Sequence, residues 1–337
     1  MSVTIKDVAR EAGVSVATVS RVLNGSTNVS ENSTRLVKDT IERLNYSPNF
    51  LGRNLRKCAT NVILVIMPTS DHSLYMKIVA GMQNYANKVG YDIITTASNS
   101  TSQVEMRQMN MLFNRTVDGV VLLGTSYNAE TLNRLAENYD VALCCEGVEG
   151  ANVLTVTVND EQAGYDAVRA LIRKGHRKIA FIGTEDSAVS SSQRESGYLR
   201  ALNEYNIPVN PNYIYKGTYD FWHGGIAMEQ FAALKERPTA VFAVSDILAM
   251  NAIRKACELG LTVGKDISVM GFDNISMCEM MNPTVSTVEQ PCAKMGELVV
   301  QKLIDNFASS NKDNRYYTVE HLSLIHISEP TRLRCIS

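Results

Sequence analysis

Apolar residues in the first 46 positions recur at the spacing of α-helices, in three short runs. The first run predicts a helix over residues 4–13, which Thr4 begins as N-cap and Gly13 ends. Ser15 and Ser30 are suitable N-caps for the second and third helices. Two short helices across a glycine-containing turn, supported by a third, are typical of a helix-turn-helix unit, which places a recognition helix in the major groove of DNA.

The second predicted helix has an outward face beside its apolar stripe. Val16 and Ala17 stand in its first turn and Arg21 one turn later, where a recognition helix contacts base edges. Arg21 can pair with guanine O6 and N7, while Val16 and Ala17 can pack on thymine methyl groups. A small helical bundle that binds nothing is the alternative that this pattern alone leaves open.

Residues 47–57 form a basic segment that is too short to be a stable helix by itself. Ser47 is a good N-cap, and Pro48 suits the first helical position. Leu55 stands among basic side chains and has little local core to bury it. Such a segment is typical of a minor-groove binder that orders on DNA and inserts an apolar wedge between base pairs.

From residue 61 the pattern changes to buried strands that alternate with helices. Residues 62–67 are a continuous apolar run ending at Pro68, as in a parallel strand covered on both faces. A helix at about 76–89 follows. Further strands are predicted at 91–96, 119–123, 141–145, 179–182, 240–244 and 267–270. This alternation predicts an α/β fold with doubly wound parallel sheets, arranged in two lobes with a cleft between them.

Ligands of open α/β sheets bind at the carboxyl ends of the strands, which selects the residues that follow each predicted strand. Arg194, Asp246 and Asp273 are the groups there best suited to bidentate hydrogen bonds with ligand hydroxyls. Aromatic side chains that can stack on a sugar or base are Tyr75, Tyr219, Phe221 and Trp222. A helix cap or a salt bridge is the alternative role for each residue taken singly.

Composition and charge narrow the class of protein. The 337 residues include no run of the length and apolarity of a membrane span and no secretory leader, so we expect a cytoplasmic protein without membrane association. Seven cysteines without metal-site spacing predict neither a metal site nor another cofactor. Residues 1–58 hold nine basic and five acidic residues, a net charge of +4, whereas the remainder has a net charge of −6. A basic head on an acidic body fits the binding of a polyanion.

Two other classes of protein share parts of this pattern. A solute-binding transport protein has a two-lobed body but no use for residues 1–57. An enzyme is not expected, because the sequence shows no nucleophile–base pairing, phosphate-binding loop or metal cluster.

The head resembles that of the lactose/galactose repressor family of bacterial transcription regulators in TIKDVA (4–9), AGVSVATVSRVLN (12–24) and YSPN (46–49). The body resembles the sensor domain of that family, itself similar to periplasmic sugar-binding proteins, at residues 174–183, 194–198, 238–243 and 266–273. The resemblance runs from Thr4 to about Leu322. It implies a helix-turn-helix head and a periplasmic-binding-protein-like sensor, hence a repressor controlled by a small-molecule effector such as a sugar or nucleoside.

The resemblance also implies which residues contact DNA. Positions matching Val16, Ala17 and Arg21 read bases in that family, and the position matching Leu55 intercalates at the operator centre. The candidates that touch phosphates or brace the recognition helix are Thr4, Ser15, Thr18, Asn24, Tyr46 and Asn49. The partner implied is double-stranded, pseudo-palindromic operator DNA, bound by a homodimer.

In the sensor, Arg194 and Asp273 match the arginine and aspartate that hold effectors in the family. The remaining effector-binding candidates are His72, Leu74, Tyr75, Asp160, Tyr219 and Asp246. The loop at residues 69–75 departs from the common family pattern, as does Ser245, where an asparagine is common; the effector therefore stays open. A catabolite-control regulator that acts with a phosphocarrier protein is the alternative within the family.

These inferences divide the chain into a DNA-binding head at 1–46, a hinge at 47–60 and an effector-binding and dimerisation domain at 61–322. Residues 323–337 resemble translated adapter or vector sequence, and we expect them to be a non-native tail.

Overall fold

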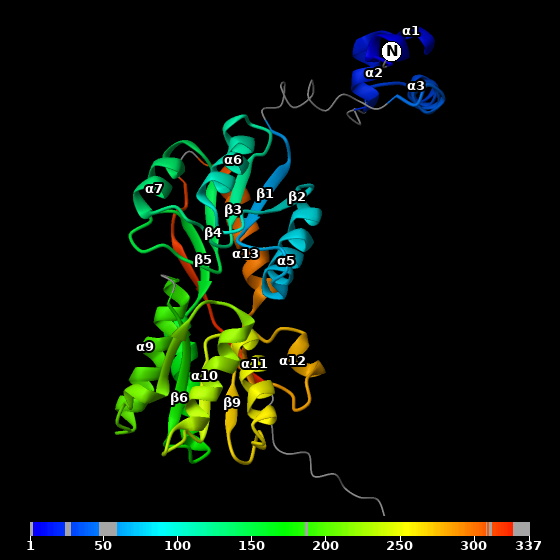
Figure 1. The fold of residues 1–337 in the computed structure, drawn as a ribbon. Coiled ribbons are helices and arrows are strands. Elements are labelled where there is room, and N and C mark those ends of the chain that lie inside the picture. Colours follow the sequence, from blue (N-terminus) through cyan, green and yellow to red (C-terminus); the bar gives the residue numbers. More distant parts are fainter. Residues whose placement is uncertain are drawn as a thin grey trace, which may run out of the picture. The chain divides into compact units, whose positions relative to one another are not determined.

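The computed structural model describes residues 3–23, 28–46, 59–185, 188–307, 309 and 312–325, the last four by their backbone (Figure 1). The chain divides into two compact units: residues 1–60, which contain the predicted head, and residues 61–337, which we call the body. Asn24, Asn49 and Leu55, which we predicted to contact DNA, lie outside the described residues. Within the described part, no helix is both long enough and apolar enough to cross a bilayer.

The described residues of the head contain three helices at the predicted positions: α1 (Ile5–Glu11), α2 (Val16–Leu23) and α3 (Glu31–Arg43). Gly13 follows the first helix with a φ of 63°, a conformation that glycine adopts without strain. Ser30 caps α3, because its side chain accepts a hydrogen bond from the backbone N–H of Ser33. A small core holds the helices together, with fully buried side chains at its centre: Val8, Val19 and Val37.

The first lobe of the body contains a six-stranded sheet in the order β11-β5-β4-β3-β1-β2, with every pairing parallel. Its strands are β1 (Val62–Met67), β2 (Asp92–Ala97), β3 (Gly119–Leu122), β4 (Val141–Cys144), β5 (Leu154–Val158) and β11 (Tyr316–Val319). Its helices are α5 (Ser73–Val89), α6 (Ser102–Phe113), α7 (Ala129–Asn138) and α13 (Cys292–Phe307).

Helices cover both faces of this sheet, which explains why β1 is apolar throughout. Ile63 and Val65 pack in one core cluster with side chains of α5 and α13. Leu64 and Ile66, on the opposite face, pack in a second cluster with side chains of α6 and α7. A strand buried on both faces has no solvent-facing position, so its sequence does not alternate.

The second lobe repeats this plan with four parallel strands in the order β7-β6-β8-β9 (Figure 1). The strands are β6 (Ile179–Thr184), β7 (Ile214–Gly217), β8 (Ala240–Ala243) and β9 (Ser268–Met270). The helices are α8 (Asp160–Arg173), α9 (Val189–Glu204), α10 (Phe221–Ala233), α11 (Asp246–Glu258) and the short α12 (Met277–Met280), with a 3-10 turn at Pro211–Tyr213.

The described chain passes between the lobes from β5 to α8, from β10 (Thr287–Glu289) to α13, and from β11 to β12 (Leu322–Ile325). Strands β10 and β12 pair in antiparallel fashion, with Thr287 opposite Ile325. Leu324 and Ile325 of the predicted tail thus pair with the body, whereas residues 326–337 lie outside the described part.

Candidate functional site

The recognition helix α2 presents the predicted base-reading residues to solvent. Val16 is 42% exposed although it is apolar, and Ala17 and Arg21 are also exposed. Ala17 and Arg21 are four residues apart, so they lie on the same side of the helix. Val19 is fully buried and points to the other side, into the head core. The arrangement leaves one continuous face of α2 available to a ligand.

Hydrogen bonds fix the start of this helix. Ser15 Oγ accepts a bond from the Thr18 backbone N–H at 3.1 Å and lies 2.9 Å from the Thr18 hydroxyl. Both predicted residues therefore build the N-terminus of α2, whose exposed backbone N–H groups and positive dipole end suit a phosphate. Tyr46, another predicted DNA contact, is half-buried against the head core.

Thr4 and Asp7 form a reciprocal cap at the start of α1. The Asp7 carboxylate accepts hydrogen bonds from the backbone N–H of Thr4 at 3.0 Å and from its hydroxyl at 2.6 Å. Arg10 donates to the other oxygen of Asp7 at 2.7 Å. The hydrogen bonds from Thr4 lower the pKa of Asp7 most, and the positive charge of Arg10 lowers it further. Thr4 thus stabilises the start of α1 through Asp7.

In the body, Arg194 lies at the centre of the predicted effector site. Its Nε donates to Asp160 Oδ1 at 2.8 Å, and one terminal nitrogen donates to the Val244 carbonyl at 2.7 Å. The same nitrogen lies 3.8 Å from Asp273 Oδ1, and the guanidinium covers the Phe272 ring at 3.7 Å. These contacts bring together the carboxyl ends of β5, β8 and β9, as the strand-end rule predicts.

Asp273 is held in an unusual backbone conformation, with a φ of 119°. Its backbone N–H donates to the Val288 carbonyl, and its Oδ1 accepts from Gln290 Nε2 at 2.7 Å. Burial raises the pKa of Asp273, against the opposing effects of Arg194 and His72. Among the described residues, Oδ2 has no hydrogen-bond partner although it is buried.

Asp246, by contrast, makes its hydrogen bonds within its own lobe. Its Oδ2 accepts from the Ile275 backbone N–H at 2.9 Å, and its Oδ1 accepts from the Thr287 hydroxyl at 2.5 Å. Burial, and then the negative charge of Asp273, raise the pKa of Asp246 to about 7. The geometry makes Asp246 a residue that holds the turn after β9.

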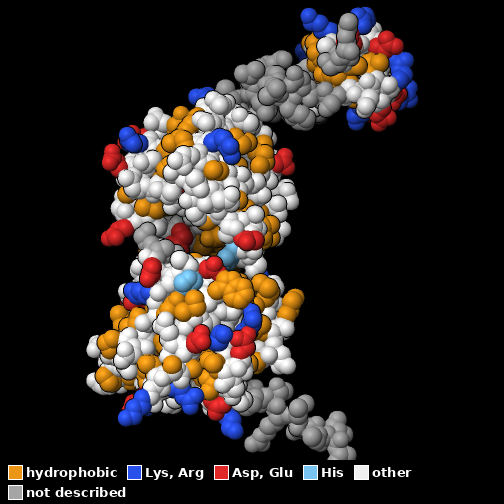
Figure 2. Space-filling view, in the orientation of Figure 1, with side chains coloured by type: hydrophobic (Ala, Val, Ile, Leu, Met, Phe, Trp, Pro, Cys, Tyr) orange, Lys and Arg blue, Asp and Glu red, His pale blue; other side chains and the backbone are white. Residues whose placement is uncertain are grey.

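His72, Leu74 and Tyr75 approach this cluster from the first lobe. Helix α5 begins at Ser73, three residues earlier than predicted, so His72 is its N-cap and the two aromatic residues lie at its first turn. The His72 ring lies 5.1 Å from the Tyr75 ring and 5.9 Å from the Tyr219 ring of the second lobe. Leu74 is buried in the first-lobe core and burial raises the pKa of Tyr75. Figure 2 shows acidic and histidine side chains where the body narrows between its lobes.

Two further contacts join the lobes. Ser190 of α9 donates hydrogen bonds to Glu146, through its hydroxyl and, at 3.3 Å, its backbone N–H. Burial raises the pKa of Glu146 to about 7, against the bond from Ser190. Lys77 Nζ donates to the Asn274 carbonyl at 2.6 Å. Glu146 directly follows a predicted strand and is selected by the strand-end rule, whereas Lys77 lies inside a helix, carries no such signal and was missed.

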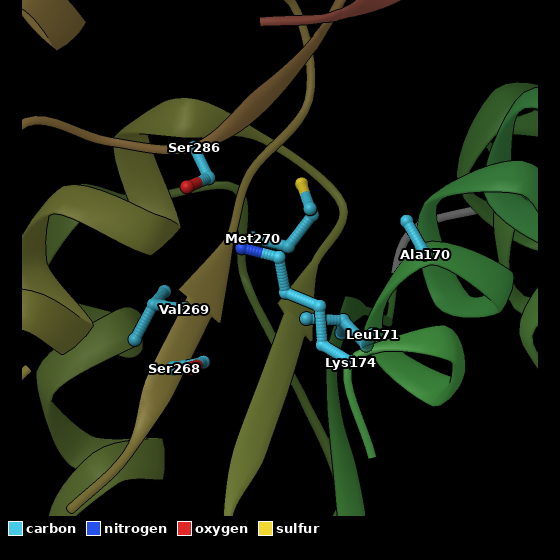
Figure 3. Close-up of a pocket in the computed structure, with 7 residues that line it drawn as sticks. All are labelled: Ala170, Leu171, Lys174, Ser268, Val269, Met270 and Ser286. Atoms are coloured by element: carbon cyan, nitrogen blue, oxygen red, sulfur yellow. The ribbon is translucent and has the colours of Figure 1, made fainter. Parts of the chain in front are cut away.

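Two cavities of the described residues lie away from this cluster. One, of about 10 Å³, holds space for a single water and lies between α8 and β9, beside Leu171, Lys174 and Met270 (Figure 3). The other, of about 170 Å³, lies between α10 and α11 beside Trp222 and Arg254. Trp222 is 59% exposed there, so the structure separates it from the strand-end cluster in which we placed it. Within the described residues, no group of three or more His, Cys, Asp or Glu side chains can hold a metal.

Comparison with known proteins gives two family matches. Residues 4–49 match the bacterial regulatory proteins of the lacI family, and residues 168–325 match the periplasmic binding protein-like domain. The chain is 34% identical to catabolite control protein A of Priestia megaterium, over 95% of this chain and 97% of that protein. It is 30% identical to the HTH-type transcriptional repressor PurR of Aliivibrio salmonicida (strain LFI1238), over 93% and 95% of the two chains.

Solved structures agree on the fold. A lac repressor dimer bound to operator and an anti-inducer superposes with a TM-score of 0.86 and 24% identity, covering 97% of this chain and 98% of that one. The transcriptional regulator CelR in complex with cellobiose gives a TM-score of 0.72 and 26% identity, covering 96% and 98%. With its helix-turn-helix head and two-lobed body, the chain belongs to the lacI family of bacterial regulatory proteins, which are DNA-binding transcription regulators.

Proposed function

We propose that this regulator is a homodimeric repressor whose α2 reads operator bases through Val16, Ala17 and Arg21. The observation that supports this most directly is an exposed apolar residue, Val16, beside an exposed arginine on a helix whose other face is buried. Thr4, Ser15, Thr18 and Tyr46 then position the helix or touch phosphates. Asn24, Asn49 and Leu55 belong to the same proposal through the family resemblance alone.

The effector site of this proposal is the cluster at the strand ends of the body. The buried ion pair of Arg194 with Asp160, and the contact of Asp273 with the same guanidinium, support this assignment. His72, beside Tyr75 in the first lobe, faces Tyr219 of the second lobe, so these aromatic side chains contact a ligand from both sides. Leu74 and Asp246 act indirectly, because one is in the core and the other holds the turn after β9.

Binding in such a site regulates DNA affinity by favouring one arrangement of the lobes over another. A ligand that contacts both lobes stabilises the arrangement in which those contacts form, and the coupling free energy between two sites is commonly about 1–3 kcal/mol. The CelR–cellobiose complex supports a sugar as the class of effector, and the family resemblance also implies a nucleoside-like metabolite as a candidate.

Operator selection followed by titration tests the proposal. Duplexes that bind the full chain are enriched from a random pool, and the affinity for the best duplex is measured with and without each of a panel of sugars, nucleosides and purines. We expect a sequence-specific duplex, a steep decrease of affinity with salt, and at least one metabolite that changes the affinity. Binding without sequence preference, or an affinity that no metabolite changes, would refute it.

The similarity to catabolite control protein A supports a second candidate, a regulator that acts with a phosphocarrier protein. Phosphorylated carrier protein, added to the same operator assay, separates the two. An increase in operator affinity with the carrier and none with any metabolite favours the second candidate.

A further inference from the structure

We propose that His72 determines which effectors this regulator accepts, by sharing one ligand hydroxyl with Asp273 across the two lobes. The inference rests on the proposed effector site and adds a ligand class to it: a neutral compound with at least two neighbouring hydroxyl groups. It begins from polar atoms that the fold buries and leaves without a partner.

Three such atoms are His72 Nδ1, Asp273 Oδ2 and Gln290 Oε1, none of which has a hydrogen-bond partner among the described residues. Asp273 is 1% exposed and Gln290 is 3% exposed, so both are built into the interior. Exchanging the oxygen and nitrogen of the Gln290 amide would break a hydrogen bond, because its Nε2 already donates to Asp273 Oδ1 at 2.7 Å. A buried polar atom without a partner costs free energy, which a ligand that pairs it would recover.

The chemistry of these atoms specifies the ligand group. A carboxylate oxygen and an amide oxygen only accept hydrogen bonds, so the ligand must donate to Asp273 and to Gln290. A neutral imidazole nitrogen either donates or accepts, according to its tautomer. A hydroxyl is the group that can donate to Asp273 and accept from His72 at once. A second hydroxyl beside the first supplies the donor that Gln290 requires.

The acceptor oxygens around the site disfavour an anionic ligand group there. The carboxyl groups nearby are those of Glu146, Asp160, Asp246 and Asp273, and Asp71 precedes His72 in its loop. Against them stand Arg194, already bound to Asp160 and the Val244 carbonyl, and Lys77, bound to the Asn274 carbonyl. A phosphate or carboxylate would bring further acceptors to atoms that need donors.

The position of His72 makes it a residue that selects ligands rather than one that fills space. Its ring lies against Tyr75 on its own helix and against Tyr219 from the opposite lobe, at interplanar angles of 41° and 48°. The two tyrosines hold the ring from both lobes, so its nitrogens keep a defined direction. Phenylalanine at this position retains the ring contacts and removes both nitrogens.

The test compares His72→Phe with wild-type protein and with a matched control, His176→Phe. His176 lies just before β6, and its Nδ1 is 3.0 Å from the Thr239 hydroxyl, so it belongs to the amino end of the strands rather than to the site. A thermal-shift screen uses neutral monosaccharides and nucleosides, each beside its phosphate ester or its carboxylate derivative. Calorimetry then measures the best neutral ligand and its single-deoxy analogues on all three proteins.

We expect the neutral compounds to bind more tightly than their anionic counterparts, and His72→Phe to weaken the best ligand at least tenfold while His176→Phe changes nothing. One deoxy analogue should bind wild-type protein at least tenfold more weakly than the parent ligand, and its loss of affinity relative to the parent should be smaller in His72→Phe, because in that variant the hydroxyl keeps only its contact with Asp273. Equal binding by His72→Phe, preference for an anionic compound, or no binding of any neutral compound overturns the inference. A ligand that binds independently of His72 and still changes operator affinity leaves the proposed function intact.

Discussion

Arg194 and Asp160 form an ion pair almost wholly removed from water: Nε donates to Oδ1 at 2.8 Å, and the two side chains are 5% and 3% exposed. The pair joins α9 to the first residue of α8, where the chain has just crossed from the first lobe. Asp273 approaches the same guanidinium from the end of β9. One cation thus connects three elements of the second lobe at the proposed effector site.

Replacement of Arg194 by methionine should lower the free energy of unfolding of the body by about 3–5 kcal/mol, because it leaves two buried carboxylates without their cation. Chemical denaturation followed by circular dichroism measures this loss. Lys178→Ala serves as control: its pair with Glu236 is 47% and 74% exposed, and such pairs contribute about 0–1 kcal/mol. Similar losses in both variants would show that the buried cluster has no special role in stability.

Most of the fold could be predicted from the sequence, because buried parallel strands have a strong local signature. The predicted strands correspond to β1, β2, β3, β4, β6, β8 and β9. Strand β5 is fully buried but was missed, since its threonines interrupt the apolar run: Thr155 and Thr157 bond carbonyl groups instead of solvent. Strands β7 and β11 lie at sheet edges and are partly exposed, so their sequences are less apolar.

The site was harder to predict than the fold. The strand-end rule found Arg194 and Asp273, because it needs only the positions of the strands. The rule could not show that Asp246 holds the turn after β9, because the residues that donate hydrogen bonds to it, Ile275 and Thr287, are distant from it in sequence. Nor could it exclude Trp222, whose place on the outside of α10 depends on how that helix packs against α11.

Gly197→Ala should move α9 away from α8 and destabilise the body by about 1–3 kcal/mol, the usual cost of overpacking a tight contact. A Cβ atom at Gly197 would lie 2.2 Å from the Glu161 carbonyl oxygen, a backbone atom that cannot rotate away. Ser196→Ala, on the exposed side of the same helix, is the control. Thermal unfolding of the two variants checks the expectation, and an unchanged midpoint for Gly197→Ala would contradict this account of the helix contact.

Arg21→Ala should weaken binding to the selected operator by about 1–3 kcal/mol and relax the preference at one base pair of each half-site, as expected for the loss of a bidentate contact to guanine. Lys38→Ala, an exposed residue of α3, is the control, because a lost charge lowers affinity for all sequences alike. Binding assays on the operator and on single-base variants provide the measurement. An unchanged base preference would remove Arg21 from the base-reading set.

Glu146 makes the stability of the body depend on pH, since burial raises the pKa of its carboxyl from an ordinary value near 4.5 to about 7. A carboxyl whose folded-state pKa is raised favours folding while it is protonated in both states, and this contribution is lost as the pH rises from about 4.5 through about 7. Glu146→Gln keeps the shape and accepts from Ser190, but it does not ionise. The variant should therefore match wild-type stability near pH 4.5 and exceed it at pH 8 by roughly 1–3 kcal/mol.

Denaturant unfolding at pH values from 4.5 to 8 measures this difference between Glu146→Gln and wild-type protein. The matched control is Glu236→Gln, because Glu236 is 74% exposed and its substitution should shift the whole curve little and without dependence on pH. Asp246 also has a raised pKa, so wild-type protein and both variants should share a further decrease in stability over the same range. If the curves of Glu146→Gln and wild-type protein stay parallel, the carboxyl of Glu146 ionises as easily in the folded body as in the unfolded chain, and its contact with Ser190 is open to water.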